Sequence, residues 1–404
     1  MTKKANLDTP KWEQSIKRLR KNSWYSYNQA VTLYEEFHQT SMDSLIEEAL
    51  SEQSDRVAEH ELRIYDRIVD FREFLIDEGF KASTIQTHMT RIKSLYNKSR
   101  VRIPYIPQMD VINIKKSQPI GYDDLLTKEE LVKAYDQFSS LKTKARFLAM
   151  VSGGLSNDEC SNITTRQFID DLYKYHQCDD DVDALKYLSE SNNIIWVALL
   201  VRGKTAKPFY AVLSPECVQV TARAKLQEAQ KGEIKEKLYG NKNYFTQKCT
   251  RINTHLKFGT AGDGKGRFRS HMIRKYHATT LADSHLSNQE IDELQGRGKT
   301  RVQEAYIKTN PNRQKILYAR IINQVSLFHE YEYEILNEHD PAKMDVRLKV
   351  VNQKEKSKKL EIENRNLHKK LDSSEEIRKE LENLMEDKGK DTILNIFAEL
   401  LNDS

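Results

Sequence analysis

The chain has 404 residues, 31% of them charged, and a formal net charge of +5, which permits nucleic acid as a partner without requiring it. That length allows two or three domains. The chain has no apolar run near the roughly 18 residues of a membrane span, no apolar signal core, and four scattered cysteines without a C-x-x-C pair. These features exclude a membrane protein, a disulfide framework and a cysteine-based zinc site, and we expect a soluble cytoplasmic protein.

The first 98 residues are predicted to form an arm followed by a small helical domain. Residues 1–22 are polar and basic, which indicates a loose arm. Residues 23–98 place apolar side chains at three- and four-residue steps, the period of amphipathic helices. The last of these predicted helices carries Arg91 and Lys93 between its apolar positions.

A linker and a second domain are predicted next. Residues 99–122 contain three of the eight prolines and show no helical period. Because proline disfavours a helical conformation in the residue before it, this stretch is expected to be extended. Thr127 and Glu130 then have the spacing of a capping box, so a helix of the second domain, 123–335, is expected to begin here.

Two stretches of the second domain have a clear local pattern. Residues 145–164 read as an apolar helix, a Gly-Gly turn and a polar helix start. Residues 194–213 hold two apolar, β-rich runs around a turn that contains Lys204, which predicts an antiparallel hairpin. The expected fold class is therefore mainly α with a small antiparallel β-hairpin.

Residues 268–318 contain three features in order: the pair His271 and Arg274, a Gly-Arg step that ends at Arg297, and an isolated Tyr306. On a helix, the first two lie on one face. Arg and His donors stabilise charge on a phosphate, and a tyrosine hydroxyl can attack it to form a phosphotyrosyl ester. Residues 251–320 carry 14 Lys and Arg against 6 Asp and Glu, whereas residues 1–120 carry 19 against 17. The basic charge is thus concentrated where a phosphate-binding surface is expected.

This order and spacing resemble the second conserved box of the tyrosine recombinase (phage integrase) family, most closely its archaeal branch. The resemblance extends over roughly residues 60–327. It implies a helical core-binding domain at 23–98 and a tyrosine recombinase catalytic domain at 123–335. It also implies that double-stranded DNA is the partner, that a tetramer assembles on the DNA, and that neither a metal nor another cofactor is needed.

The resemblance also implies a role for each matching residue. Tyr306 would attack the phosphate, which gives a 3′-phosphotyrosyl enzyme and a free 5′-hydroxyl. His271, Arg274 and Arg297 would hold the phosphate, Arg297 standing where most members carry His or Trp. Lys204 resembles the mobile hairpin lysine that protonates the leaving 5′-oxygen. Further DNA contacts are expected from five basic residues: Arg267, Arg269, Lys275, Arg91 and Lys93.

The chain departs from the family's first box, Gly-Leu/Met-Arg-x-x-Glu. Gly154, Leu155 and Glu159 match it, but Ser156 occupies the position of the first catalytic arginine. Serine cannot supply a bidentate cation, and losing one such contact typically costs about 10²–10³ in rate. Either another cation fills the space or the enzyme is weakened or silent. The candidate cations nearby in sequence are Arg146, Arg166 and Arg202.

The C-terminal residues 343–404 differ in composition, with 14 basic and 14 acidic residues. Leu360, Leu367 and Leu371 lie near heptad spacing, which predicts a coiled coil that could associate with other copies. Residues 392–401 are expected to form an amphipathic helix. This helical tail lies outside the common recombinase core.

Three functions remain open at this point. The first is a site-specific recombinase (integrase) that integrates or excises a mobile element or virus, or resolves chromosome dimers. The second is a DNA-binding protein of recombinase descent that no longer cuts DNA, because of Ser156. The third is a structural or assembly protein that works through the coiled coil, but this class predicts no basic bias around Arg274. Tyr318 is a second candidate nucleophile, although its helical spacing with Ile321 and Ile322 favours packing.

Overall fold

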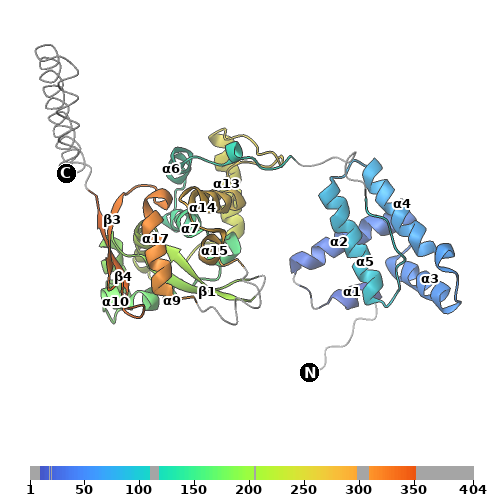
Figure 1. The fold of residues 1–404 in the computed structure, drawn as a ribbon, viewed down its shortest axis with the longest axis horizontal. Coiled ribbons are helices and arrows are strands. Elements are labelled where there is room, and N and C mark those ends of the chain that lie inside the picture. The colour runs from blue at the N-terminus through green and yellow to red at the C-terminus, as the bar shows by residue number, and fades with distance from the viewer. Residues whose placement is uncertain are drawn as a thin grey trace, which may run out of the picture. The chain divides into compact units, whose positions relative to one another are not determined.

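A computed structural model describes residues 10–17, 19, 21–109, 118–203, 206–297 and 309–351. Contacts divide the chain into two compact units, residues 1–120 with 262–264 and residues 121–261 with 265–404. The described part is mainly helical, with two separate antiparallel sheets of two strands each (Figure 1). The predicted fold class is confirmed. Among the described residues, no helix is both long enough and apolar enough to cross a membrane.

The first unit consists of amphipathic helices around one apolar core. The hydroxyls of Tyr34 and Tyr96 meet inside this core at 3.1 Å, where Phe71 packs edge-on against Tyr34. This contact joins the helices α2, α4 and α5 through buried side chains. The helices are α1 (Lys11–Ile16), α2 (Lys21–His38), α3 (Met42–Ser54), α4 (Arg63–Asp77) and α5 (Ala82–Lys98), with a 3-10 turn at Glu59–Glu61.

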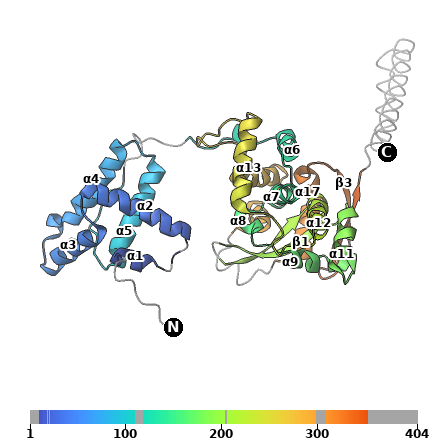
Figure 2. The same ribbon diagram turned by 180° about the vertical axis from the view of Figure 1, so that it is seen from behind.

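The second unit is built around α7, in which every residue from Ala145 to Gly153 is buried. Helix α12 packs directly against α7 (Figure 2), and so does α14, which is labelled in Figure 1. The helices of this unit are α6 (Lys128–Asp136), α7 (Leu141–Gly153), α8 (Asn157–Cys160), α9 (Thr165–Asp171), α10 (Tyr173–His176), α11 (Asp181–Glu190), α12 (Pro215–Ala229), α13 (Lys242–His255), α14 (Ser270–Asp283), α15 (Asn288–Leu294) and α17 (Pro311–Val325).

Side chains at the starts of two helices of this unit bond to the backbone, and the cap at Thr127 is the predicted one. The backbone N–H of Glu130 donates to the Thr127 hydroxyl at 3.2 Å, and the Glu130 carboxylate accepts from the Thr127 N–H at 3.0 Å. The Ser214 hydroxyl likewise accepts from the Cys217 N–H at the start of α12. These caps satisfy amide donors that would otherwise lack a helical partner.

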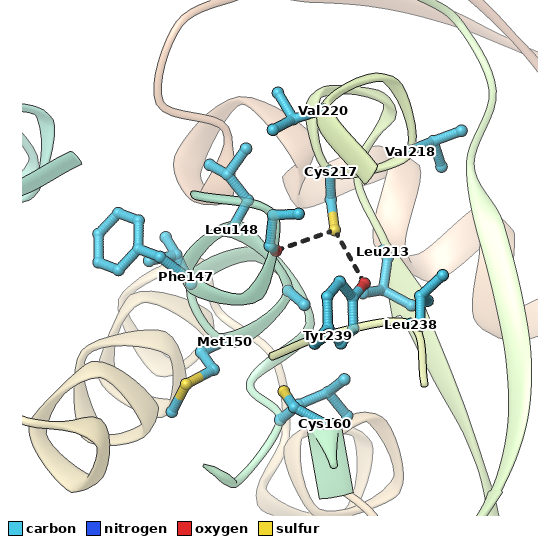
Figure 3. Close-up of a cluster of buried hydrophobic side chains, with 14 of the residues drawn as sticks. Phe147, Leu148, Met150, Cys160, Leu213, Cys217, Val218, Val220, Leu238 and Tyr239 are labelled. Atoms are coloured by element: carbon cyan, nitrogen blue, oxygen red, sulfur yellow. Dashed lines mark hydrogen bonds between the residues drawn. The ribbon is translucent and has the colours of Figure 1, made fainter. Parts of the chain in front are cut away.

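Buried thiols belong to the core of the second unit. Figure 3 shows Cys217 among apolar side chains, with its sulfur 3.8 Å from the Ala145 carbonyl oxygen and 3.6 Å from the Tyr239 hydroxyl. Burial raises the pKa of Cys217 and of the neighbouring Cys160 to about 12. These two thiols are therefore neutral packing groups, and all four cysteines are free.

The predicted hairpin is present as β1 (Trp196–Val201) and β2 (Pro208–Leu213), paired antiparallel from Trp196 with Leu213 to Val201 with Pro208. The second sheet pairs β3 (Tyr331–Leu336) with β4 (Asp345–Val350). The prediction of a helical tail from residue 343 is therefore wrong for 345–350. Apolar Val346 and Leu348 alternate with charged residues, and this alternation is the two-residue period of a strand. Both apolar side chains are buried in a cluster with residues of α17. Residues 352–404 of the predicted tail lie outside the described part.

Candidate active site

The start of α14 holds the His-x-x-Arg pair. His271 lies in the first turn and is exposed, and Arg274 follows one turn later with its side chain 12% exposed. Between them, Met272 and Ile273 are buried, which fixes the face that the helix turns towards the core. The amphipathic pattern therefore holds Arg274 at the boundary between the protein interior and solvent.

The Arg274 guanidinium is fixed by three groups from two other segments. Nη1 donates to Glu159 Oε2 at 2.9 Å and to the Gly154 carbonyl oxygen at 2.7 Å, and Nη2 donates to the Gln295 carbonyl oxygen. Burial lowers the pKa of Arg274, and Glu159 opposes this by raising it. The nearby positive charges of Arg202 and Arg297 lower the pKa further.

Ser156 holds Glu159 in place. As the N-cap of α8, Ser156 donates its backbone N–H to Glu159 Oε2 at 2.7 Å, and its hydroxyl accepts from the Glu159 N–H. The residue at the first-box arginine position therefore orients a carboxylate that is itself only 5% exposed. It contributes no positive charge.

The three candidate replacements for the missing arginine have different environments. Arg146 is buried and donates to Asn157, Ser161 and the Gly240 carbonyl, so its guanidinium is engaged inside the fold. The Arg166 side chain is 62% exposed and is paired with two surface aspartates, Asp170 and Asp181.

Arg202 is the candidate that lies beside Arg274. Its Nε is 3.9 Å from Glu159 Oε1, and its Nη1 donates to the Gly296 carbonyl oxygen at 2.8 Å. The neighbouring carbonyl, that of Gln295, is the one that accepts from Arg274. Two guanidinium groups thus share one carboxylate and one turn of backbone.

This turn, which follows α15, requires a glycine. Gly296 has φ +62°, a region that disfavours side chains, and a Cβ there would lie 2.4 Å from the Phe209 ring on β2. The turn therefore packs directly on the hairpin. It leads to Arg297, whose side chain is 44% exposed and lies 3.4 Å from Asp292. Lys204 and Tyr306, the predicted acid and nucleophile, lie outside the described residues.

His277 is a neighbour of the site that the sequence analysis missed. Its ring is buried, 2.9 Å from Gln295 Nε2, and burial lowers its pKa to about 3. A Cβ on Gly154 would lie 2.4 Å from the same ring. His277 follows Arg274 by three residues on the same helix, and this spacing could have placed it near the site. The sequence around a buried neutral histidine has no pattern that distinguishes it from other histidines.

Arg267 makes several contacts within the second unit. Its guanidinium donates to the carbonyls of Asp124 and Leu125 and to both carboxylate oxygens of Glu130, and its side chain is 18% exposed. Residues 259–266, a loop with four glycines, precede Arg267. An antiparallel bridge between Thr260 and Gly266 joins the two ends of this loop. Arg267 stays a predicted DNA contact, and its guanidinium already has these partners within the second unit.

The other predicted DNA contacts lie on two units. Arg269 precedes α14 and donates to the Gly266 carbonyl, and Lys275 is half-buried on α14. In the first unit, Arg91 lies over the Tyr27 ring at 4.8 Å. Lys93 lines a hollow on α5 together with Arg72 and other residues. These four residues stay predictions.

The charges at the site favour an anion. The guanidinium groups of Arg202 and Arg274 flank one buried carboxylate, Glu159, and the positive charges of Arg202 and Arg297 both lower the pKa of Arg274. A phosphate would bring the negative charge that this arrangement lacks, and the planar forks of arginine match phosphate oxygens in pairs.

No family model matches the chain, and no curated protein matches it. Among solved structures, it is similar to the Tn1549 transposon integrase in complex with transposon right-end DNA, at 11% identity and TM-score 0.42, over 74% of this chain and 94% of that one. It is also similar to the XerH site-specific recombinase bound to difH substrate, at 15% identity and TM-score 0.38, over 62% and 68%. A third is the integrase from mycobacterium phage Brujita, at 11% identity and TM-score 0.33, over 78% and 91%.

Proposed function

We propose that this chain is a site-specific DNA recombinase of the integrase type, which cleaves and rejoins strands through a 3′-phosphotyrosyl intermediate. The observation that supports this most directly is the convergence of Arg274 and Arg202 on Glu159, next to the turn that leads to Arg297. A cluster of guanidinium groups with one shared carboxylate suits a phosphate in its charged transition state. The basic surplus of residues 251–320 suits a surrounding DNA surface.

The chemistry assigned to the site requires one bond to form and one to break. The Tyr306 hydroxyl gives its proton to water as its oxygen attacks the phosphorus, and the bond from phosphorus to the 5′-oxygen breaks. Arg274, Arg297 and His271 stabilise the charge on the non-bridging oxygens. Lys204 gives its proton to the departing 5′-oxygen. The roles of Tyr306 and Lys204 come from their positions in the sequence.

The assembly belongs to the same proposal. Strand exchange between two duplexes needs four cleavages, so a tetramer on DNA is expected, acting in a reduced cytoplasm on a mobile element. The predicted coiled coil at the C-terminus offers a means of self-association. These parts rest on the sequence alone.

The test is the covalent adduct itself. Nicked suicide duplexes, tiled across the DNA that flanks the gene for this chain, are incubated with wild type, Tyr306→Phe and Tyr318→Phe. Tyr318 is the matched control because it is buried, donates to the Ser152 carbonyl at 3.1 Å, and has a pKa raised by burial. We expect adducts on a denaturing gel with wild type and Tyr318→Phe and none with Tyr306→Phe. An adduct that persists in Tyr306→Phe contradicts the assigned nucleophile.

The second candidate function is a DNA-binding protein that no longer cuts. The observation that favours it is that Ser156 caps helix α8. Ser156 stands at the position where the family pattern has its first catalytic arginine. This candidate predicts that wild type shifts the duplexes on a native gel but leaves no adduct on any of them.

A further inference from the structure

We propose that Arg202 is a catalytic residue of this site, which binds a non-bridging oxygen of the scissile phosphate beside Arg274 and supplies the guanidinium that Ser156 cannot. The inference rests on the proposed function and deepens it, because it names the group that replaces the missing arginine.

The backbone of Arg202 is anchored at the end of the hairpin. It follows β1 directly, its N–H donates to the Lys207 carbonyl at 2.9 Å, and its own carbonyl accepts from the Ala206 N–H at 2.9 Å. The side chain then extends to Glu159 and to the Gly296 carbonyl. Because Gly296 packs on Phe209 of β2, both ends of this arginine are held by the same hairpin.

Arg202 and Arg274 bind opposite oxygens of one carboxylate. Arg274 Nη1 is 2.9 Å from Glu159 Oε2, and Arg202 Nε is 3.9 Å from Oε1. A carboxylate shared in this way places two guanidinium planes near each other before any ligand arrives. Such preorganisation lowers the cost of gathering charge around a transition state.

The guanidinium of Arg202 also keeps capacity for a ligand. An arginine has five N–H donors. Within the described ranges, Arg202 makes one hydrogen bond through its guanidinium, to Gly296, whereas Arg146 uses its guanidinium for four. The Arg202 side chain is 24% exposed, twice the 12% of Arg274, so it is the more open of the two to solvent.

The charge balance points the same way. One carboxylate, Glu159, lies between two guanidinium groups, and the positive charge of Arg202 lowers the pKa of Arg274 by repulsion. Arg297 adds to this repulsion, although it has Asp292 as its own partner. A bound phosphate relieves the repulsion, and this relief is largest in a transition state that carries more negative charge than the ground state.

The experiment compares adduct formation by Arg202→Ala, Arg202→Lys and Arg166→Ala on the suicide duplex that wild type cleaves. Arg166 is the matched control, an exposed arginine of the same unit that is paired with two aspartates. We expect a rate loss of about 10²–10³-fold for Arg202→Ala, a smaller loss for Arg202→Lys, and no loss for Arg166→Ala. Thermal unfolding of each full-length variant shows whether it folds.

Two further measurements separate phosphate binding from a supporting role. A methylphosphonate at the scissile position lacks one negative charge, so the loss caused by Arg202→Ala should shrink at least tenfold on that duplex. Adding Ser156→Arg to Arg202→Ala should recover at least tenfold in rate on ordinary DNA. A loss of equal size on both duplexes, with no recovery, makes Arg202 a structural residue and overturns the inference.

The remaining outcomes are distinguishable. If wild type forms adducts and Arg202→Ala forms them equally fast, the inference is overturned and the proposed function stands. If wild type binds the tiled duplexes without any adduct, the proposed function is overturned and the inference with it.

Discussion

Arg274 and Glu159 form an ion pair in which Nη1 and Oε2 lie 2.9 Å apart and the side chains are only 12% and 5% exposed. Surface ion pairs contribute little to stability, but removing one partner of a buried pair leaves a charge without compensation. Glu159 has a second cation beside it, Arg202 at 3.9 Å. This carboxylate therefore supports two positive groups at once.

We expect Glu159→Gln to destabilise the fold by about 3 kcal/mol, because it leaves a buried guanidinium uncompensated. The free energy of unfolding is measured in denaturant for the full chain. The control is Asp170→Asn, which breaks the exposed pair with Arg166 and should change stability much less. Equal effects of the two substitutions would show that burial of the Arg274 pair is unimportant.

Gly154→Ala should be more destabilising than Gly232→Ala. Both glycines have positive φ, +59° and +92°, so each substitution carries a backbone penalty of about 1 kcal/mol. Only the Cβ at residue 154 meets a side chain, the His277 ring at 2.4 Å, whereas the Cβ at 232 meets nothing within 4 Å. The additional clash should add about 1–3 kcal/mol. Melting temperatures that fall equally in both variants would contradict the close approach.

The buried His277 should make stability fall in mild acid. Its folded pKa is about 3, below the 6.5 of the unfolded chain, so above pH 6.5 both states are neutral and the group has no effect. As the pH falls below 6.5, the His277 ring binds a proton in the unfolded state but not in the folded state. Stability then declines by up to about 1.4 kcal/mol per pH unit until the pH nears the folded value.

The measurement is the pH dependence of unfolding between pH 7 and pH 5 for wild type and His277→Gln. The variant starts less stable, because it loses packing, but it should lose less stability on acidification, by about 2 kcal/mol at pH 5. Parallel curves for the two proteins would mean that residue 277 is not the group that titrates.

The sequence predicted the elements that depend only on neighbouring residues. The hairpin of β1 and β2 follows from apolar, β-rich runs around a glycine-containing turn, and the helix start at Thr127 follows from the spacing to Glu130. The strand β4 was missed because its alternation covers only six residues in a highly charged stretch, which a helical pattern also fits.

The sequence did not predict contacts between segments that are distant in the chain. Arg146, Arg166 and Arg202 were equal candidates there, since nothing local distinguishes an arginine that binds carbonyls in the core from one beside Arg274. For the same reason the sequence did not predict the internal partners of Arg267. Its partners Asp124, Leu125 and Glu130 lie more than a hundred residues earlier in the chain.

The proposed proton donor can be tested by changing the leaving group. Lys204→Ala should slow adduct formation by about 10²–10⁴-fold on ordinary DNA, because the 5′-alkoxide then leaves without a proton. A duplex with sulfur in place of the bridging 5′-oxygen releases a thiolate, whose conjugate acid has a pKa near 8.5 and needs no such help. The variant should therefore approach the wild-type rate on the sulfur-containing duplex. Lys207→Ala, at the other end of the same turn, is the matched control and should be unaffected on both duplexes. If Lys204→Ala is equally slow on oxygen- and sulfur-bridged DNA, residue 204 acts in some way other than by protonating the leaving group.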